Sequence, residues 1–243
     1  MNIIYGVCYY YERLRYNSIF NHINSYKKLV NAYPQYSFKF IVNVMCDDKD
    51  VSKRDEKISL LKDNIKITDI DYLFLHEFNY GGTIAGLYNT YHYVKENKLY
   101  DNLNTYIMYF EEDFYPINND FLKDSLTILK TSDNIYIGES TRGSFKMDNT
   151  HNPILSSYYH MDIIAKWTDG GFYFSSLANF NKIYEKIGNF HKGDTTTLYD
   201  HLLDGIRLGE VGFPSLIHKS GYNFTGLLRE KYFIHLYNNI LLV

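Results

Sequence analysis

Short apolar runs alternate with amphipathic helical patterns along the first part of the chain. The runs have the length and the aromatic and β-branched content of buried strands, while the helical patterns repeat apolar residues every three or four positions. Strands are predicted at 2–11, 38–45, 71–75, 106–110 and 134–138, and helices at 17–33, 84–94 and 119–130. This alternation predicts an α/β fold with a mostly parallel central sheet flanked by helices on both faces.

The second part of the chain has a different pattern. Residues 140–168 are polar and contain few periodic runs, which is typical of long functional loops. After them, the pattern predicts a strand at 172–174, helices at 177–187 and 197–208, and a final strand at 215–218. Because the sequence contains no internal repeat and no low-complexity segment, we expect a single domain.

The strand predicted at 106–110 ends in three acids, Glu111, Glu112 and Asp113. Open α/β sheets bind ligands at the carboxyl ends of their strands, and crowded carboxylates repel one another unless a cation lies among them. A hard divalent metal ion that holds phosphate would suit such a place. The alternative is a strand that simply ends in water, where acidic side chains cost little free energy.

Two other predicted elements have candidate ligand-binding residues beside them. Asp47 and Asp48 follow the second predicted strand, and the paired glycines Gly81 and Gly82 precede a predicted helix. Such glycines let the backbone approach a ligand at the positively polarised end of the helix, although a tight turn would use them equally well. The two acids could likewise bind a ligand or only cap a helix.

Length, charge and hydropathy exclude several classes of protein. The 243 residues suffice for one large α/β domain, and the formal net charge of -3, with scattered lysine and arginine, argues against nucleic acid as a partner. No apolar run approaches the roughly 20 residues that span a bilayer, and Met1 leads into a strand rather than a signal peptide. We therefore expect a soluble, cytoplasmic protein without a transmembrane segment, or one in the host cytoplasm if a virus encodes it.

The cysteine and tyrosine content suggests no further site. Cys8 and Cys46 are the only cysteines and lie in apolar runs, which favours buried thiols in a reducing compartment. The 26 tyrosines could stack on bases or sugar rings, but an AT-rich genome also enriches tyrosine. We favour this compositional explanation for most of them.

Four stretches resemble, in the same order, glycosyltransferases of the GT-A fold, especially the large inverting family that uses nucleotide sugars. They are N-Y-G-G-T at 79–83, F-E-E-D at 110–113, D-G-G at 169–171, and Y-D-H-L-L-D at 199–204 with the strand that ends in His218. They are similar to that family's Asn-x-Gly-Gly turn, its D-x-D motif, its acceptor-side glycine turn and its Glu-Asp helix. Glu111 and Tyr199 depart from the pattern, because they replace an aspartate and a glutamate.

The resemblance implies a fold and an activity. The fold would be GT-A-like (Rossmann-like), with a nucleotide-sugar-binding half at 1–138 and an acceptor-binding half at 139–243 of one domain, 1–243. The activity would be the inverting transfer of a sugar from a nucleoside-diphosphate sugar to a glycan or a protein-linked saccharide. A UDP or dTDP sugar is favoured, because Asp47 or Asp48 could accept the imide N–H of uracil or thymine.

The resemblance also implies roles for individual residues. Asp113 would ligate Mn²⁺ or Mg²⁺ together with Glu111, and His218 as a third ligand would favour Mn²⁺. The residues expected to contact the nucleotide sugar are Asp47, Asp48, Asn79, Gly82, Glu111, Glu112 and Asp113. Those expected to contact the acceptor are Trp167, Gly170 and Gly171.

An inverting transfer needs a general base that takes the proton from the acceptor hydroxyl. Asp200 is our first choice because of its place in the Y-D-H-L-L-D helix, and Asp169 and Asp204 are the alternatives.

Two other functions stay open. A sugar nucleotidyltransferase would also use carboxylates and metal, but such enzymes usually carry a glycine-rich loop with a basic residue after the first strand, whereas here Gly6 is followed by Val7, Cys8 and tyrosines. A non-catalytic carbohydrate-binding protein on a decayed transferase fold would tolerate the glutamate at position 111.

Overall fold

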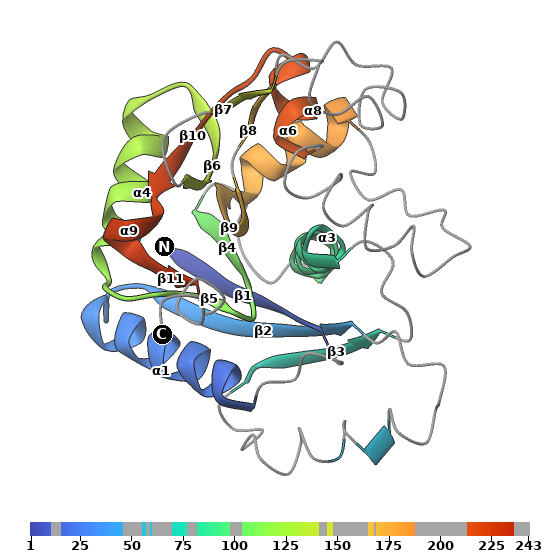
Figure 1. The fold of residues 1–243 in the computed structure, drawn as a ribbon, viewed down its shortest axis with the longest axis vertical. Helices are drawn as coiled ribbons and strands as arrows, with labels where there is room; N and C mark the ends of the chain where they lie inside the picture. The colour runs from blue at the N-terminus through green and yellow to red at the C-terminus, as the bar shows by residue number, and fades with distance from the viewer. Residues whose placement is uncertain are drawn as a thin grey trace.

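A computed structural model gives the arrangement of most of the chain (Figure 1). It describes residues 1–10, 16–45, 55–56, 59, 70–76, 82–97, 104–140, 145–147, 165–167, 169–187 and 213–235. None of the helices in these ranges combines the length and the apolar character that crossing a bilayer requires.

A seven-stranded sheet with the order β10-β6-β9-β4-β1-β2-β3 forms the centre of the molecule. Its strands are β1 (Asn2–Tyr10), β2 (Ser37–Met45), β3 (Tyr72–His76), β4 (Thr105–Glu111), β6 (Asn134–Ser140), β9 (Asp169–Ser176) and β10 (Asn223–Leu228). Neighbouring strands are parallel except at β9, which is antiparallel to both β4 and β6. The mostly parallel sheet that the sequence predicts is therefore confirmed.

Helices cover both faces of this sheet, as the sequence also predicts (Figure 1). One face carries α1 (Tyr16–Ala32), α4 (Asp120–Thr131) and the short α9 (Arg229–Tyr232). The other carries α3 (Gly82–Glu96), α6 (Leu177–Ile187) and α8 (Phe213–Lys219). Strand side chains alternate between the two layers, so that in β4 Met108 and Phe110 point to the first layer and Ile107 and Tyr109 to the second.

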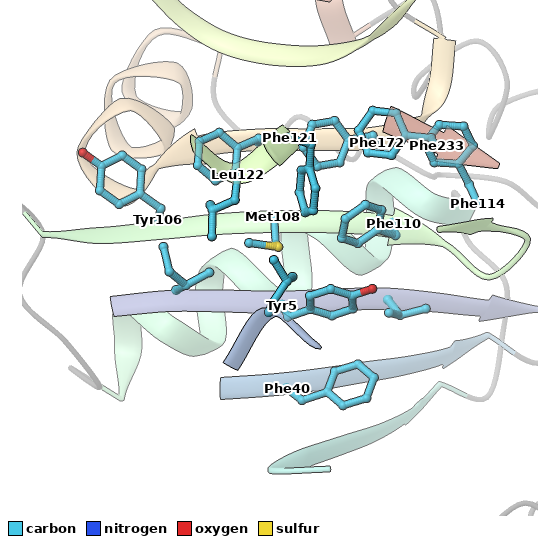
Figure 2. Close-up of a cluster of buried hydrophobic side chains, with 14 of the residues drawn as sticks. Tyr5, Phe40, Tyr106, Met108, Phe110, Phe114, Phe121, Leu122, Phe172 and Phe233 are labelled. Carbon is cyan, nitrogen blue, oxygen red and sulfur yellow. The ribbon is translucent and has the colours of Figure 1, made fainter. Parts of the chain in front are cut away.

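Aromatic side chains fill the layer between the sheet and α1 and α4 (Figure 2). The ring of Phe110 lies 4.9 Å from that of Tyr5 and 5.1 Å from that of Phe172, measured between centroids. Phe233 in turn lies 4.9 Å from both Phe114 and Phe172. Six tyrosines are among the largest fully buried side chains, so part of the tyrosine content has a structural use in the core.

Two small ribbons lie outside the main sheet. The strand β5 (Phe114–Pro116) pairs with β11 (Phe233–His235), and β7 (Phe145–Met147) pairs with β8 (Ala165–Trp167). Each of these strands has only three residues, which is too short for a hydrophobic period to reveal. The region predicted as loops at 140–168 therefore contains a short antiparallel strand pair.

The strand predicted at 215–218 is wrong, because this segment belongs to α8. Phe213 and Ile217, four positions apart, are both buried against the sheet while His218 is exposed, which is a helical pattern. Pro214 does not interrupt the helix, since the first turn needs no backbone N–H donor at that position. The last strand of the main sheet is β10, and the helix predicted at 197–208 lies outside the described residues.

Tyr109 fills a slot that two glycines leave open between β4, β1 and α3. A Cβ atom at Gly6 would overlap the edge of the Tyr109 ring and come within 2.8 Å of Cε2. A Cβ atom at Gly86 would overlap the Tyr109 hydroxyl and lie 2.9 Å from Cζ. The close approach of α3 to the sheet therefore depends on glycine at both positions.

We predict that Gly86→Ala lowers the free energy of unfolding by about 1–3 kcal/mol, because the new methyl group overpacks the Tyr109 slot. Tyr109→Phe should relieve part of this loss, because it removes the hydroxyl that the new Cβ would meet first. Urea unfolding of the single and double variants measures the coupling.

Gly6→Ala is the matched control, because its Cβ would meet the ring edge and not the hydroxyl. Tyr109→Phe should give it no relief. Equal coupling for both glycines, or none for Gly86, would contradict the slot.

Candidate functional site

Glu111, Glu112 and Asp113, which we call the acidic turn, lie where the order of the strands in the sheet reverses. From β1, the chain adds β2 and β3 on one side and then returns to place β4 on the other. The connecting helices α1 and α3 lie on opposite faces of the sheet. Such a switch point, at the carboxyl ends of the strands, is where open α/β sheets bind ligands. Glu111, the last residue of β4, is at this point.

The start of α3 lies beside the end of β4. The Thr83 hydroxyl donates a hydrogen bond of 2.6 Å to Oε1 of Glu111, and Thr83 is the second residue of α3. The N-terminus of this helix, with Gly82 as its first residue, is therefore next to the acidic turn. Gly82, the second of the paired glycines, and the acidic strand end, which the sequence analysis singled out separately, are brought together here.

Two of the three acids are buried. Only 3% of Glu112 and 4% of Asp113 is exposed, while Glu111 is half-buried. A carboxylate loses its hydration on burial, so its surroundings must compensate. The alternative of a strand that simply ends in water is therefore wrong.

A buried histidine supports the acidic turn from the side of α1. Nε2 of His22 lies 3.1 Å from the carbonyl oxygen of Glu111, and Nδ1 lies 2.9 Å from the Tyr5 hydroxyl. Burial lowers the pKa of His22 to about 4, although the neighbouring backbone carbonyls and the Asp113 charge act in the opposite direction. His22 is therefore neutral near pH 7, with its proton on Nε2, because a carbonyl oxygen can only accept. Nδ1 then accepts the hydrogen bond from Tyr5.

A buried ion pair, Glu139 with Arg229, lies at the same edge of the sheet as the three acids. Glu139, fully buried near the end of β6, accepts hydrogen bonds from Nε and Nη2 of Arg229, which begins α9 after β10. The Arg229 guanidinium also lies 5.7 Å from the centroid of the Phe114 ring. Phe114 directly follows Asp113 in the sequence. Phe114 packs so closely on β9 that a Cβ atom at Gly171 would come within 2.6 Å of its Cγ.

Sequence analysis missed His22, Glu139 and Arg229. Glu139 carried a usable signal, because it is an acid directly after the strand predicted at 134–138, as Glu111 is after 106–110. His22 and Arg229 carried none, since one lies on a helix face and the other outside every predicted element.

The other expected site residues have separate outcomes. His218 is exposed on α8 and does not end a strand. Trp167 is in β8 and Gly170 in β9, while Asp169 is the cross-strand partner of Glu139. Residues expected in the site that lie outside the described ranges are Asp47, Asp48, Asn79, Asp200 and Asp204.

The carboxylates of the acidic turn have the right chemistry for Mn²⁺ or Mg²⁺, since both ions take oxygen ligands. Within the described ranges, however, no three histidine, cysteine, aspartate or glutamate residues are grouped as they would be around a metal ion. An ion at this turn would therefore need ligands from a bound phosphate, from water or from other parts of the chain.

The sequence matches no protein-family model and no curated protein. Among solved structures, it is similar to a variant of Drosophila β-1,4-galactosyltransferase 7 in complex with manganese, UDP-galactose and xylobiose, with 11% identity, a TM-score of 0.46, and 99% of this chain and 73% of that chain covered. It is also similar to a mannosyltransferase from Pyrobaculum calidifontis in complex with GDP-mannose and Mn²⁺, with 11% identity, a TM-score of 0.47, and coverage of 93% and 54%.

A third similar structure is mannose-6-phosphate isomerase from Helicobacter pylori, with 9% identity, a TM-score of 0.43, and coverage of 78% of this chain and 77% of that chain. Two of these three proteins are glycosyltransferases, the class that the sequence motifs resemble. Because the identities are this low and the enzymes differ in class, the similarities assign neither an activity nor a residue role.

We predict that Arg229→Ala lowers the free energy of unfolding by about 3–5 kcal/mol, because it leaves the Glu139 charge buried without its cation. The double variant Arg229→Met with Glu139→Gln should recover much of this loss, since no charge is then buried. Chemical denaturation of both variants tests the pair.

Lys231→Ala provides the control, because Lys231 forms an exposed pair with Asp124 at 3.5 Å and should change stability by less than about 1 kcal/mol. The interpretation fails if Arg229→Ala is as mild as this control.

We predict a specific acid sensitivity from His22. Its pKa is lowered from 6.5 to about 4 on folding, so the unfolded chain binds the proton more readily between these values. The contribution of neutral His22 is therefore complete above pH 6.5 and is lost as the pH falls towards 4, by up to about 1.4 kcal/mol per pH unit.

His22→Gln cannot titrate, so its stability should fall less steeply than that of the wild type over this range. The unfolding free energies of both proteins are measured at several pH values, and the wild-type value is compared with the variant value at each pH. The titration of carboxylates is common to both proteins and cancels in this difference. Parallel curves for the two proteins would show that His22 is not protonated on unfolding.

Proposed function

We propose that the chain is a metal-dependent glycosyltransferase that takes its sugar from a nucleoside-diphosphate sugar. The observation that carries this proposal is the hydrogen bond between Thr83 and Glu111, which joins a helix N-terminus to an acidic turn at the switch point of the sheet. The helix N-terminus favours phosphate oxygens, and the acidic turn favours a cation. Together they suit the metal complex of a diphosphate.

The donor would lie along this edge of the sheet. Asp113 and Glu111 would hold Mn²⁺ or Mg²⁺ in this proposal. His218 does not complete this site, because it lies just before β10 begins, at the edge where the parallel strands start, whereas Asp113 follows the end of β4. When bound, the ion would act as a Lewis acid and stabilise the negative charge that grows on the leaving diphosphate. Asp47 or Asp48 would accept a hydrogen bond from the imide N–H of uracil or thymine, so UDP or dTDP is favoured over GDP.

The second half of the chain would bind the acceptor, a glycan or a protein-linked saccharide. Its hydroxyl oxygen attacks the anomeric carbon on the face opposite the diphosphate, the bond from that carbon to the diphosphate breaks, and the configuration inverts. Asp200 takes the proton of the hydroxyl, with Asp169 as the alternative base. Asp169 opposite Glu139 at the same sheet edge is compatible with that role.

Trp167, Gly170 and Gly171 stay candidates for acceptor contacts. Gly171 already has a packing requirement against Phe114, so a side chain at this position would disturb the acidic turn whether or not an acceptor contacts it.

We predict that one of UDP, dTDP, GDP and CDP binds the protein only when Mn²⁺ is present. Asp113→Asn should weaken this binding by more than the roughly 10- to 100-fold that is typical of residues one shell further out, because it removes a charged ligand while preserving the shape of the side chain. Isothermal titration calorimetry with and without Mn²⁺ measures both effects.

Asp120→Asn is the matched control, since Asp120 is exposed in the first turn of α4 and should not affect binding. Absence of binding for all four diphosphates would contradict the proposal. Glycan binding without metal would favour a carbohydrate-binding protein, and release of pyrophosphate from a nucleoside triphosphate and a sugar phosphate would favour a nucleotidyltransferase.

A further inference from the structure

Helix α1 holds both ends of the segment that contains the acidic turn. His22 reaches the carbonyl oxygen of Glu111, where β4 ends, and the Ser25 hydroxyl donates to the carbonyl oxygen of Pro116 at 3.5 Å, where β5 ends. Residues three positions apart lie on the same face of a helix, so one face of α1 contacts the segment at two points.

The His22 ring has little freedom to turn. It is fully buried, and its centroid lies 5.8 Å from that of Phe110, directly before the acids, and 6.2 Å from that of Tyr115, two positions after Asp113. The Tyr5 ring lies 5.9 Å away in an edge contact, and its hydroxyl bonds to Nδ1. The direction of the Nε2–H group is therefore fixed before any ligand binds.

Glu111 is consequently held at two places by two helices. His22 of α1 binds its carbonyl oxygen from one face of the sheet, and Thr83 of α3 binds its carboxylate from the other. Because a peptide unit is planar, fixing the one that follows Glu111 also fixes the position of the Glu112 Cα atom, from which the rest of the turn continues.

We propose that His22 is a positioning residue that preforms the acidic turn for a metal-bound diphosphate. This inference rests on the proposed function, and it assigns His22 no contact with the ligand. Partners of metal ligands that lie one shell further out contribute about 10- to 100-fold to metal affinity in proteins. We expect His22 to act with a similar magnitude through the Glu111 peptide.

The test compares wild type, His22→Phe, His22→Gln and Leu126→Ala. His22→Phe keeps an aromatic ring but loses the N–H donor, whereas the amide of His22→Gln can still donate to the Glu111 carbonyl. Leu126 is buried in the same core layer on α4, so its truncation destabilises the protein without touching the turn.

Mn²⁺ affinity is measured with UDP, dTDP, GDP or CDP present, using whichever binds the wild type most tightly, by electron paramagnetic resonance of the free ion. His22→Phe should weaken Mn²⁺ binding by about tenfold or more, and His22→Gln should restore it to within about threefold of the wild type. Leu126→Ala should leave the affinity unchanged even where its melting temperature falls as far as that of His22→Phe.

Hydrogen exchange of the amides at 112–115 provides a readout that needs no metal. These amides should exchange faster in His22→Phe than in Leu126→Ala at matched stability. If His22→Phe binds Mn²⁺ as tightly as the wild type, or leaves this exchange unchanged, the role of His22 is overturned while the proposed function stands. If the wild type binds no diphosphate with Mn²⁺, both fail.

Discussion

The burial of two carboxylates next to the switch point constrains the whole carboxyl edge of the sheet. An ion that is buried loses several kcal/mol of hydration free energy, even after the protein relaxes around it. This loss is about as large as the whole net stability of a small domain. Glu112 and Asp113 are almost completely enclosed, so the chain must bring polar groups and tight packing to this turn. Elements far apart in sequence meet at this turn: α1 through His22 and α3 through Thr83, both of which bond to Glu111, and β11 through its pairing with β5.

The sequence predicts the central architecture well because the strands are buried on both faces. In β4 every residue from Thr105 to Phe110 is buried, so the apolar run is continuous and easily recognised. The same criterion failed at 215–218, since a four-residue segment with only two apolar residues, Leu216 and Ile217, fits a strand and one turn of helix equally well. The four-residue spacing of Phe213 and Ile217 identifies this segment as a helix. That spacing is informative only once both side chains are known to be buried against the sheet.

Some residues of the candidate site can be predicted from local sequence patterns, whereas others depend on tertiary contacts. Glu111 and Gly82 could be predicted to lie together, because parallel strands end at one edge and a helix N-terminus follows β3 there. His22 could not, since its role comes from the Glu111 carbonyl, 89 positions further along the chain. Arg229 likewise acquires its role only when β10 lies beside β6 and its side chain reaches Glu139. Local sequence patterns identify groups with reactive chemistry more readily than the groups that hold them.

The glutamate at position 111 can be understood in the same terms. It departs from the D-x-D pattern, and a decayed site would be one reading of that departure. In the structure, however, its carboxylate reaches across to the Thr83 hydroxyl at 2.6 Å, while its carbonyl bonds to His22 on the opposite face. An aspartate has a side chain shorter by one methylene group, or roughly 1.5 Å, so it would not span this distance without moving α3 or β4. The longer side chain therefore has a specific structural partner, and this argues that the acidic turn and the helix N-terminus are maintained as one unit.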